Sequence, residues 1–140
     1  MRRMSATERE PPRRLFRAMR KGDGGLPPCG SAPNQLGVRP GIDIPNTPDE
    51  VVHPGTGGMS VTPDDPARLP PHVRPQSLGG RGKLPVFELS AAAIGPPLGV
   101  RLDPKHPERH AFLEPLNELT IHEYQDALCS TRPSWREVAE

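Results

Sequence analysis

The chain has 140 residues, which is enough for one domain with a modest core. Its 18 basic and 17 acidic residues nearly cancel, and this balance excludes a whole-molecule field that would hold nucleic acid or an anionic membrane. The 21 prolines and 14 glycines make disorder a competing interpretation. The apolar residues are clustered behind turn signals, however, and this favours a folded domain rich in loops.

Targeting signals are missing from the sequence pattern. No apolar run approaches the roughly 18 residues that cross a membrane, and residues 1–10 lack the apolar region of a signal peptide. Cys29 and Cys129 stand alone, without the spacing of a metal knuckle or of a disulfide framework. We therefore expect free thiols, no metal site, and a cytoplasmic protein or one delivered into a target cell without a cleaved signal.

Residues 1–12 are predicted to form a flexible, locally basic leader, and residues 13–140 the folded domain. The first strand is predicted within residues 14–20, where Arg17 shares a face with Leu15 and Met19. Arg17 then has two interpretations. It is either a snorkelling side chain at the rim of the sheet or a guanidinium fork for phosphate, because the planar group matches phosphate geometry.

A long loop over residues 22–50, which includes a possible short edge strand at 41–45, indicates either a functional surface or disorder. A glycine-rich turn at residues 52–58 follows it and leads into a strand over residues 59–62 with Ser60 and Thr62 on one face. Such a turn is compatible with a nucleotide cradle, because glycine lets the backbone come close to a ligand. An ordinary turn before a strand is the alternative interpretation, and glycine-rich turns of that kind are common.

Residues 69–75 are expected to be extended by their own prolines, either packed over the sheet or as a PxxP-type ligand. The Gly82-Lys83-Leu84 triplet fails as a phosphate-binding loop, because no Ser or Thr follows the lysine. Three further strands are predicted at 84–89, 98–103 and 109–115, the last with His110, Phe112 and Glu114 on one face. Ser90 is expected to cap a short helical turn over residues 91–94.

The C-terminal helix is the clearest local assignment. Thr120 and Glu123 match a capping box, and Ile121, Tyr124 and Leu128 form an apolar stripe at helical spacing. The His122-Glu123 pair resembles the start of a zinc motif, but Asp126 stands where the second histidine belongs, so zinc hydrolysis is not expected. Trp135 is expected to anchor the C-terminal tail to the domain.

Three blocks of the chain occur in an order that resembles the ADP-ribosyltransferase-like toxin family of the second type VI secretion effector. These blocks are Leu15-Phe16-Arg17-Ala18, Pro54 to Val61, and His110 with Glu114-Pro115. The resemblance runs over most of residues 15–135. It implies a small α+β domain with few short helices, long Pro/Gly-rich loops and a split, mixed β-sheet around a cleft for NAD. It also implies toxicity in the cytoplasm of a target cell, a macromolecular ADP-ribose acceptor and a cognate immunity protein.

The chemistry implied by this resemblance assigns roles to individual residues. Breaking the nicotinamide glycosidic bond creates a ribose cation, so the site must hold NAD rigidly and place acceptors beside the developing charge. Arg17 would bind phosphate or ribose, Ser60 would fix the nicotinamide side, and the Gly57-Gly58 backbone would let NAD lie close. Glu114 is the first choice for the acidic position, with Glu88 second. His110 either bonds the ribose or is a satisfied histidine of the sheet.

Two other functions remain open from the sequence. The first is a proline-rich partner-binding or inhibitory protein without catalysis, whose segment 69–75 docks a partner. The second is transfer of a phosphate from RNA to NAD on a related fold, which needs a stronger basic groove than this balanced chain offers.

Overall fold

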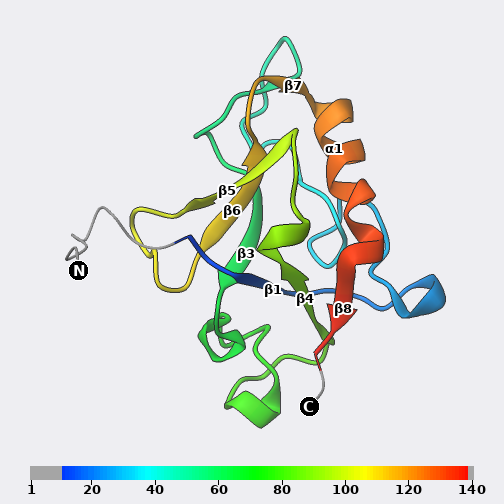
Figure 1. Ribbon diagram of the computed structural model, residues 1–140, viewed down its shortest axis with the longest axis vertical. Coiled ribbons are helices and arrows are strands. Elements are labelled where there is room, and N and C mark those ends of the chain that lie inside the picture. The colour runs from blue at the N-terminus through cyan, green and yellow to red at the C-terminus, as the bar shows by residue number, and fades with distance from the viewer. Residues whose placement is uncertain (1–10, 139–140) are drawn as a thin grey trace.

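A six-stranded antiparallel sheet in the order β5-β6-β3-β1-β4-β8 forms the centre of the molecule (Figure 1). The computed structural model describes residues 11–138, so the leader predicted at 1–12 lies almost wholly outside the described residues. A separate ribbon pairs β2 with β7. The elements are β1 (Arg14–Ala18), β2 (Val51–Val52), β3 (Met59–Pro63), β4 (Val86–Ser90), β5 (Leu98–Leu102), β6 (Ala111–Pro115), β7 (Leu119–Thr120), α1 (Ile121–Ser130) and β8 (Trp135–Glu137). The predicted α+β class is confirmed.

Strand β3 has different neighbours along its length. Residues Met59 to Val61 pair with β6, whereas Thr62 and Pro63 pair with Phe16 and Leu15 of β1. The register leaves Arg17 of β1 and Ser60 of β3 beyond the last paired residues of these two strands. Strands β1 and β3 therefore diverge at this point within the six-stranded sheet, and this divergence is the split between β1 and β3. The split is the position from which the candidate site is built.

The main core lies on one face of the sheet, beneath α1. Leu15, Met59 and Leu113 expose none of their surface, and Tyr124 and Leu128 of α1 are also fully buried. The Tyr124 hydroxyl accepts the Met59 N–H at 3.0 Å and donates to the Leu113 carbonyl. Because a buried backbone group without a partner is costly, this hydroxyl fixes the helix against two adjacent strands.

The helix and the C-terminal tail follow the sequence pattern closely. The Thr120 hydroxyl accepts the Glu123 N–H at 3.1 Å and the Glu123 carboxylate accepts the Thr120 N–H at 2.9 Å, which is the predicted capping box. Trp135 is 1% exposed and anchors the tail as predicted. Among the described residues, α1 is the only α-helix, and no helix there has the length and apolar character needed to span a membrane.

Three local predictions were wrong or incomplete. Residues 69–75 are not extended: the N–H groups of Val73 and Arg74 both donate to the Pro70 carbonyl, so the chain turns while Leu69 is buried beside Phe16. Proline fixes only its own φ, and that value suits a turn as well as an extended segment. Residues 41–45 form a turn closed by one bridge, not a strand. Ser90 precedes a 3-10 turn but makes no side-chain cap.

The expectation of free thiols was also wrong. Cys29, in the long loop, forms a disulfide with Cys129, near the end of α1, and the two Cα atoms are 5.4 Å apart. The partners are 100 residues apart in sequence, so no local spacing rule relates them. Pairing at this distance depends on the fold bringing the loop against the helix, which the sequence pattern did not specify.

We expect the double variant Cys29→Ser/Cys129→Ser to lose about 2–4 kcal/mol of unfolding free energy, because the cross-link restricts the unfolded chain. Urea unfolding without reductant measures the loss. Dithiothreitol should bring the wild type down to the variant and leave the variant unchanged. Two freely titratable thiols in the oxidised, folded wild type would contradict the pairing.

Candidate functional site

A row of three side chains crosses the sheet on the face opposite the main core. Ser60 of β3 is paired with Phe112 of β6, which is paired with Arg101 of β5, so the three side chains lie on the same face. All three are half-buried. His110, directly before β6, and Glu114, within β6, are each two residues from Phe112 and project from this same face. The predicted common face of His110, Phe112 and Glu114 is thus part of a larger array.

A chain of hydrogen bonds links Ser60, His110 and Asp103. The Ser60 Oγ lies 3.0 Å from His110 Nε2, and His110 Nδ1 lies 2.7 Å from the Asp103 carboxylate. An ionised carboxylate only accepts hydrogen bonds, so in the neutral imidazole Nδ1 carries the proton and Nε2 accepts from the Ser60 hydroxyl. The bond from His110, with a second from the Lys105 N–H, lowers the pKa of Asp103 below 3.8.

Phe112 lies between two polar groups on the same face. The guanidinium of Arg101 lies over its ring at 4.6 Å from the centroid, and the His110 ring meets it edge-on at 4.6 Å between centroids. Both arrangements are favourable for an aromatic ring, whose face is electron-rich. The row therefore places an aromatic ring in contact with a guanidinium and an imidazole, and the imidazole is bonded to the Ser60 hydroxyl.

Glu114 is already engaged in an ion pair. Its carboxylate oxygens lie 3.1 and 3.0 Å from Arg101 Nε, and one of them accepts the Gly55 N–H at 3.0 Å. The residue is 8% exposed. Glu114 therefore joins the glycine turn to β6 and orients Arg101, and its oxygens point to these partners and not to the Ser60 hydroxyl.

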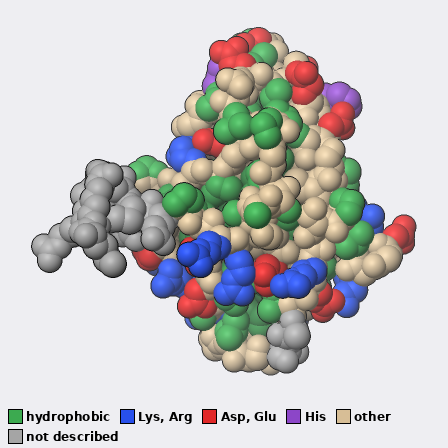
Figure 2. Space-filling model, viewed as in Figure 1, with side chains coloured by type: hydrophobic (Ala, Val, Ile, Leu, Met, Phe, Trp, Pro, Cys, Tyr) green, Lys and Arg blue, Asp and Glu red, His purple; other side chains and the backbone are tan. Residues whose placement is uncertain are grey.

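Glu88, the second choice for the acidic position, lies at the other end of the sheet on β4. Its carboxylate lies 3.9 Å from Arg14 and 3.5 Å from Arg136. Figure 2 shows basic side chains gathered with acidic ones between them over the lower part of the visible face, where β1 and β4 run in Figure 1. Glu88 therefore pairs with Arg14 and Arg136 and does not belong to the row of Ser60.

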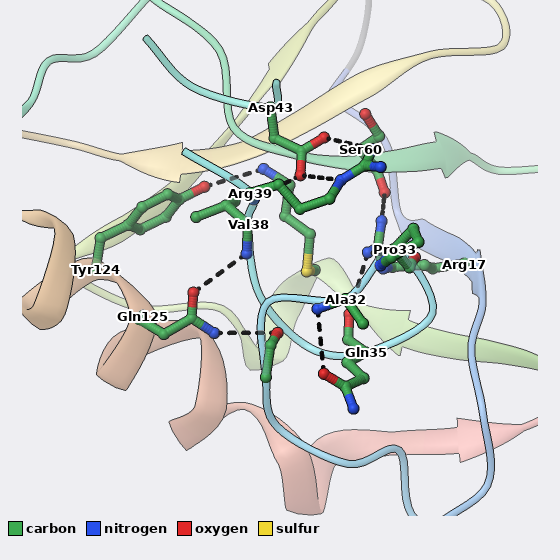
Figure 3. A network of polar contacts seen from close by, with 12 residues as sticks. Arg17, Ala32, Pro33, Gln35, Val38, Arg39, Asp43, Ser60, Tyr124 and Gln125 are labelled. Atoms are coloured by element: carbon green, nitrogen blue, oxygen red, sulfur yellow. Dashed lines mark hydrogen bonds and ion pairs between the residues drawn. The ribbon is translucent and has the colours of Figure 1, made fainter. Parts of the chain in front are cut away.

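Arg17 lies on the core side of the sheet, because it alternates with Phe16, whose β3 partner Thr62 shares a face with Ser60. Its Nη1 donates to the Ser60 carbonyl at 2.8 Å, and its Nη2 donates to the carbonyls of Pro33 and Gln35 at 3.0 and 3.1 Å (Figure 3). Removal from water lowers the pKa of Arg17 to about 10. The guanidinium fills the split between β1 and β3 and ties the long loop to it.

The glycines of the turn make room for the chain's own loop. Gly57 has φ +138°, and a Cβ there would lie 2.3 Å from the Asp43 carbonyl oxygen. The Gly58 N–H donates to that same oxygen at 3.0 Å. Asp43 is itself held by Arg39 through bonds of 3.1 and 3.2 Å (Figure 3). The close approach predicted at Gly57 and Gly58 is thus made to residues 39–44.

The structure brings Ser60 and His110 into contact, with Glu114 beside them on the same face. It places the guanidinium of Arg17 on the opposite side of the sheet from the Ser60 hydroxyl. Sequence reasoning missed Asp103 and Arg101. A signal for Asp103 was available, since pairing the predicted strands 98–103 and 109–115 as a hairpin sets Asp103 opposite His110, where the backbone N–H of Asp103 donates to the His110 carbonyl.

Within residues 11–138, no three His, Cys, Asp or Glu side chains gather as a metal-binding group. No family model, curated protein or solved structure matches the chain.

We expect Arg17→Ala to lose about 2–4 kcal/mol of unfolding free energy, because the change strips a donor from three carbonyls, of Ser60, Pro33 and Gln35. Chemical denaturation measures the loss. Arg20→Ala removes an exposed arginine two residues beyond β1 and should change the stability by less than about 0.5 kcal/mol. Equal stability of both variants would contradict a structural role for Arg17.

We expect Asp103→Asn to lose about 1 kcal/mol of stability at pH 7, because a charge-assisted bond to His110 becomes a neutral one. The folded-state pKa of Asp103 is lowered, so its contribution is present above 3.8 and is lost as pH falls through the lower folded value. Unfolding at a series of pH values should show the two proteins converging in acid. A difference in stability that is constant with pH would contradict this linkage.

Proposed function

We propose that the chain is an NAD-dependent ADP-ribosyltransferase-type toxin whose reaction takes place on the face that carries Ser60. The observation that carries the proposal is the contact between Ser60 and His110. These residues come from two blocks of the family-like order, lie 50 residues apart in sequence, and meet at 3.0 Å on a half-buried face. The diverging strands β1 and β3 agree with the split sheet expected of such a domain.

The reaction breaks the bond between C1′ of the ribose and the nicotinamide nitrogen. The bonding electron pair leaves with nicotinamide, a nucleophile of the acceptor bonds to C1′, and the proton of that nucleophile passes to a base. Because Ser60 donates its hydroxyl proton to His110, its oxygen lone pairs are free to accept from the carboxamide of nicotinamide. Phe112, between His110 and Arg101, offers aromatic edge contact to the nicotinamide. Asp103 keeps the imidazole of His110 in the orientation that this arrangement needs.

The partners proposed here follow from the resemblance in residues 15–135. They are a macromolecule in the cytoplasm of a target cell that accepts ADP-ribose, and an immunity protein that blocks the site. The half-buried row of Ser60, Phe112 and Arg101 is the surface that such an inhibitor would have to cover.

The test compares wild type, Ser60→Ala and Ser77→Ala, a serine in the short turn Gln76–Leu78 away from the row. With NAD labelled in the nicotinamide ring, we expect Ser60→Ala to release nicotinamide about 100-fold more slowly, because one preorganised polar contact is lost. Ser77→Ala should match the wild type. Absence of NAD binding and turnover in the wild type, with equal growth of cells that express each protein, would overturn the proposal.

A second candidate function is favoured by one observation, the hydrogen-bond chain from Ser60 through His110 to Asp103. The same order of groups activates a serine nucleophile in acyl hydrolases. Hydrolysis also needs backbone or side-chain N–H donors aimed at an oxyanion. Arg17 is not free to be such a donor, because its Nη1 donates to the Ser60 carbonyl. A fluorophosphonate probe separates the two candidates, because a hydrolase would be labelled covalently at Ser60 and the transferase would not.

A further inference from the structure

We propose that Arg101 is the residue that binds the pyrophosphate of a dinucleotide, in place of Arg17, to which the family resemblance assigned phosphate or ribose. The inference rests on the proposed function for the identity of the ligand as NAD. Its structural basis is independent of catalysis: an oriented, half-buried guanidinium lies in the same row as Ser60, separated from it by one aromatic ring.

The first argument concerns position. Arg101, Phe112 and Ser60 are paired residues on three successive strands, so the Cα atoms of Arg101 and Ser60 are about 10 Å apart at the usual strand spacing. A nicotinamide held at Ser60 and in contact with the edge of Phe112 would then direct its ribose and the attached phosphates toward β5. The order of groups along NAD matches the order of side chains along the row.

The second argument concerns the free end of the guanidinium. The Nε of Arg101 donates to the Glu114 carboxylate oxygens at 3.0 and 3.1 Å, and its Cζ lies over the Phe112 ring. Among residues 11–138, neither its Nη1 nor its Nη2 donates a hydrogen bond. The side chain is 30% exposed. Two parallel N–H donors on a fixed plane match the oxygens of a phosphate.

The third argument concerns the competing charges. Among the described residues, the carboxylates on this face of β5 and β6 are Glu114 and, directly after β5, Asp103, and both already accept hydrogen bonds. Glu114 accepts from Arg101 and the Gly55 N–H, whereas Asp103 accepts from His110 and the Lys105 N–H. Each carboxylate thus points into the sheet or its loops, and the Nη1 and Nη2 atoms of Arg101 remain able to bind an anion. Arg17 offers no such edge, because both of its terminal nitrogens donate to backbone carbonyls.

The experiment measures binding by titration calorimetry with two probes: ADP-ribose, which carries the pyrophosphate, and nicotinamide riboside, which has no phosphate. The variants are Arg101→Ala, Arg101→Lys and, as a matched control on another strand, Arg136→Ala. Arg101→Ala removes the partner of a buried carboxylate, so thermal unfolding is recorded for each variant. Arg101→Lys keeps a positive charge beside Glu114 and covers the case in which the alanine variant does not fold.

We expect Arg101→Ala to weaken ADP-ribose binding about 10- to 100-fold and Arg101→Lys to weaken it several-fold, because lysine keeps the charge but lacks the fork. Nicotinamide riboside should bind all variants within about twofold, and Arg136→Ala should match the wild type for both probes. Undiminished ADP-ribose binding in folded Arg101→Ala or Arg101→Lys overturns the assignment, as does a wild type that binds no ADP-ribose. A wild type that binds ADP-ribose through Arg101 but releases no nicotinamide from NAD supports the assignment and overturns only the transferase.

Discussion

The structure depends on one strand that serves two neighbours. Residues Met59 to Val61 of β3 pair with β6, and Thr62 and Pro63 pair with β1. Where β1 departs, the carbonyl of Ser60 would lack a strand partner on that side, and Arg17 supplies the missing donor at 2.8 Å. The guanidinium also binds two carbonyls of the long loop. The side chain of Arg17 thus lies between the diverging strands and bonds the long loop to β3.

The residues that hold the backbone around Ser60 lie on one face of the sheet, and the side chains of the candidate site lie on the other. Arg17, Asp43 and Tyr124 lie on the core side and fix the backbone around Ser60. The hydroxyl of Ser60 projects to the other side, where it meets His110, and Phe112 and Arg101 extend the row to β5. A side chain can be positioned accurately when its own backbone is bonded from behind, and Ser60 is held in this way.

Much of the strand and helix arrangement could be predicted from the sequence, because strands and helix caps leave local residue patterns. Alternation placed His110, Phe112 and Glu114 on one face, and the capping box set the start of α1 at Ile121. Alternation does not say how the faces of two strands correspond until their register is known, so it could not show that the side chains of Arg17 and Ser60, both assigned to NAD by the resemblance, lie on opposite faces. The prolines of residues 69–75 suit a turn as well as an extended segment, and the Cys29–Cys129 bond depends on long-range packing, which leaves no local signal.

The disulfide gives the molecule an unusual covalent topology. Ser60, Arg101, Asp103, His110 and Phe112 all lie inside the ring that the Cys29–Cys129 bond closes, and Arg17 lies outside it. If a protease cuts the chain once between the two cysteines, the disulfide therefore keeps both pieces, and all the residues of the row, in one covalent molecule. Only cleavage between Arg17 and Cys29 would release β1, which is the strand that carries Arg17.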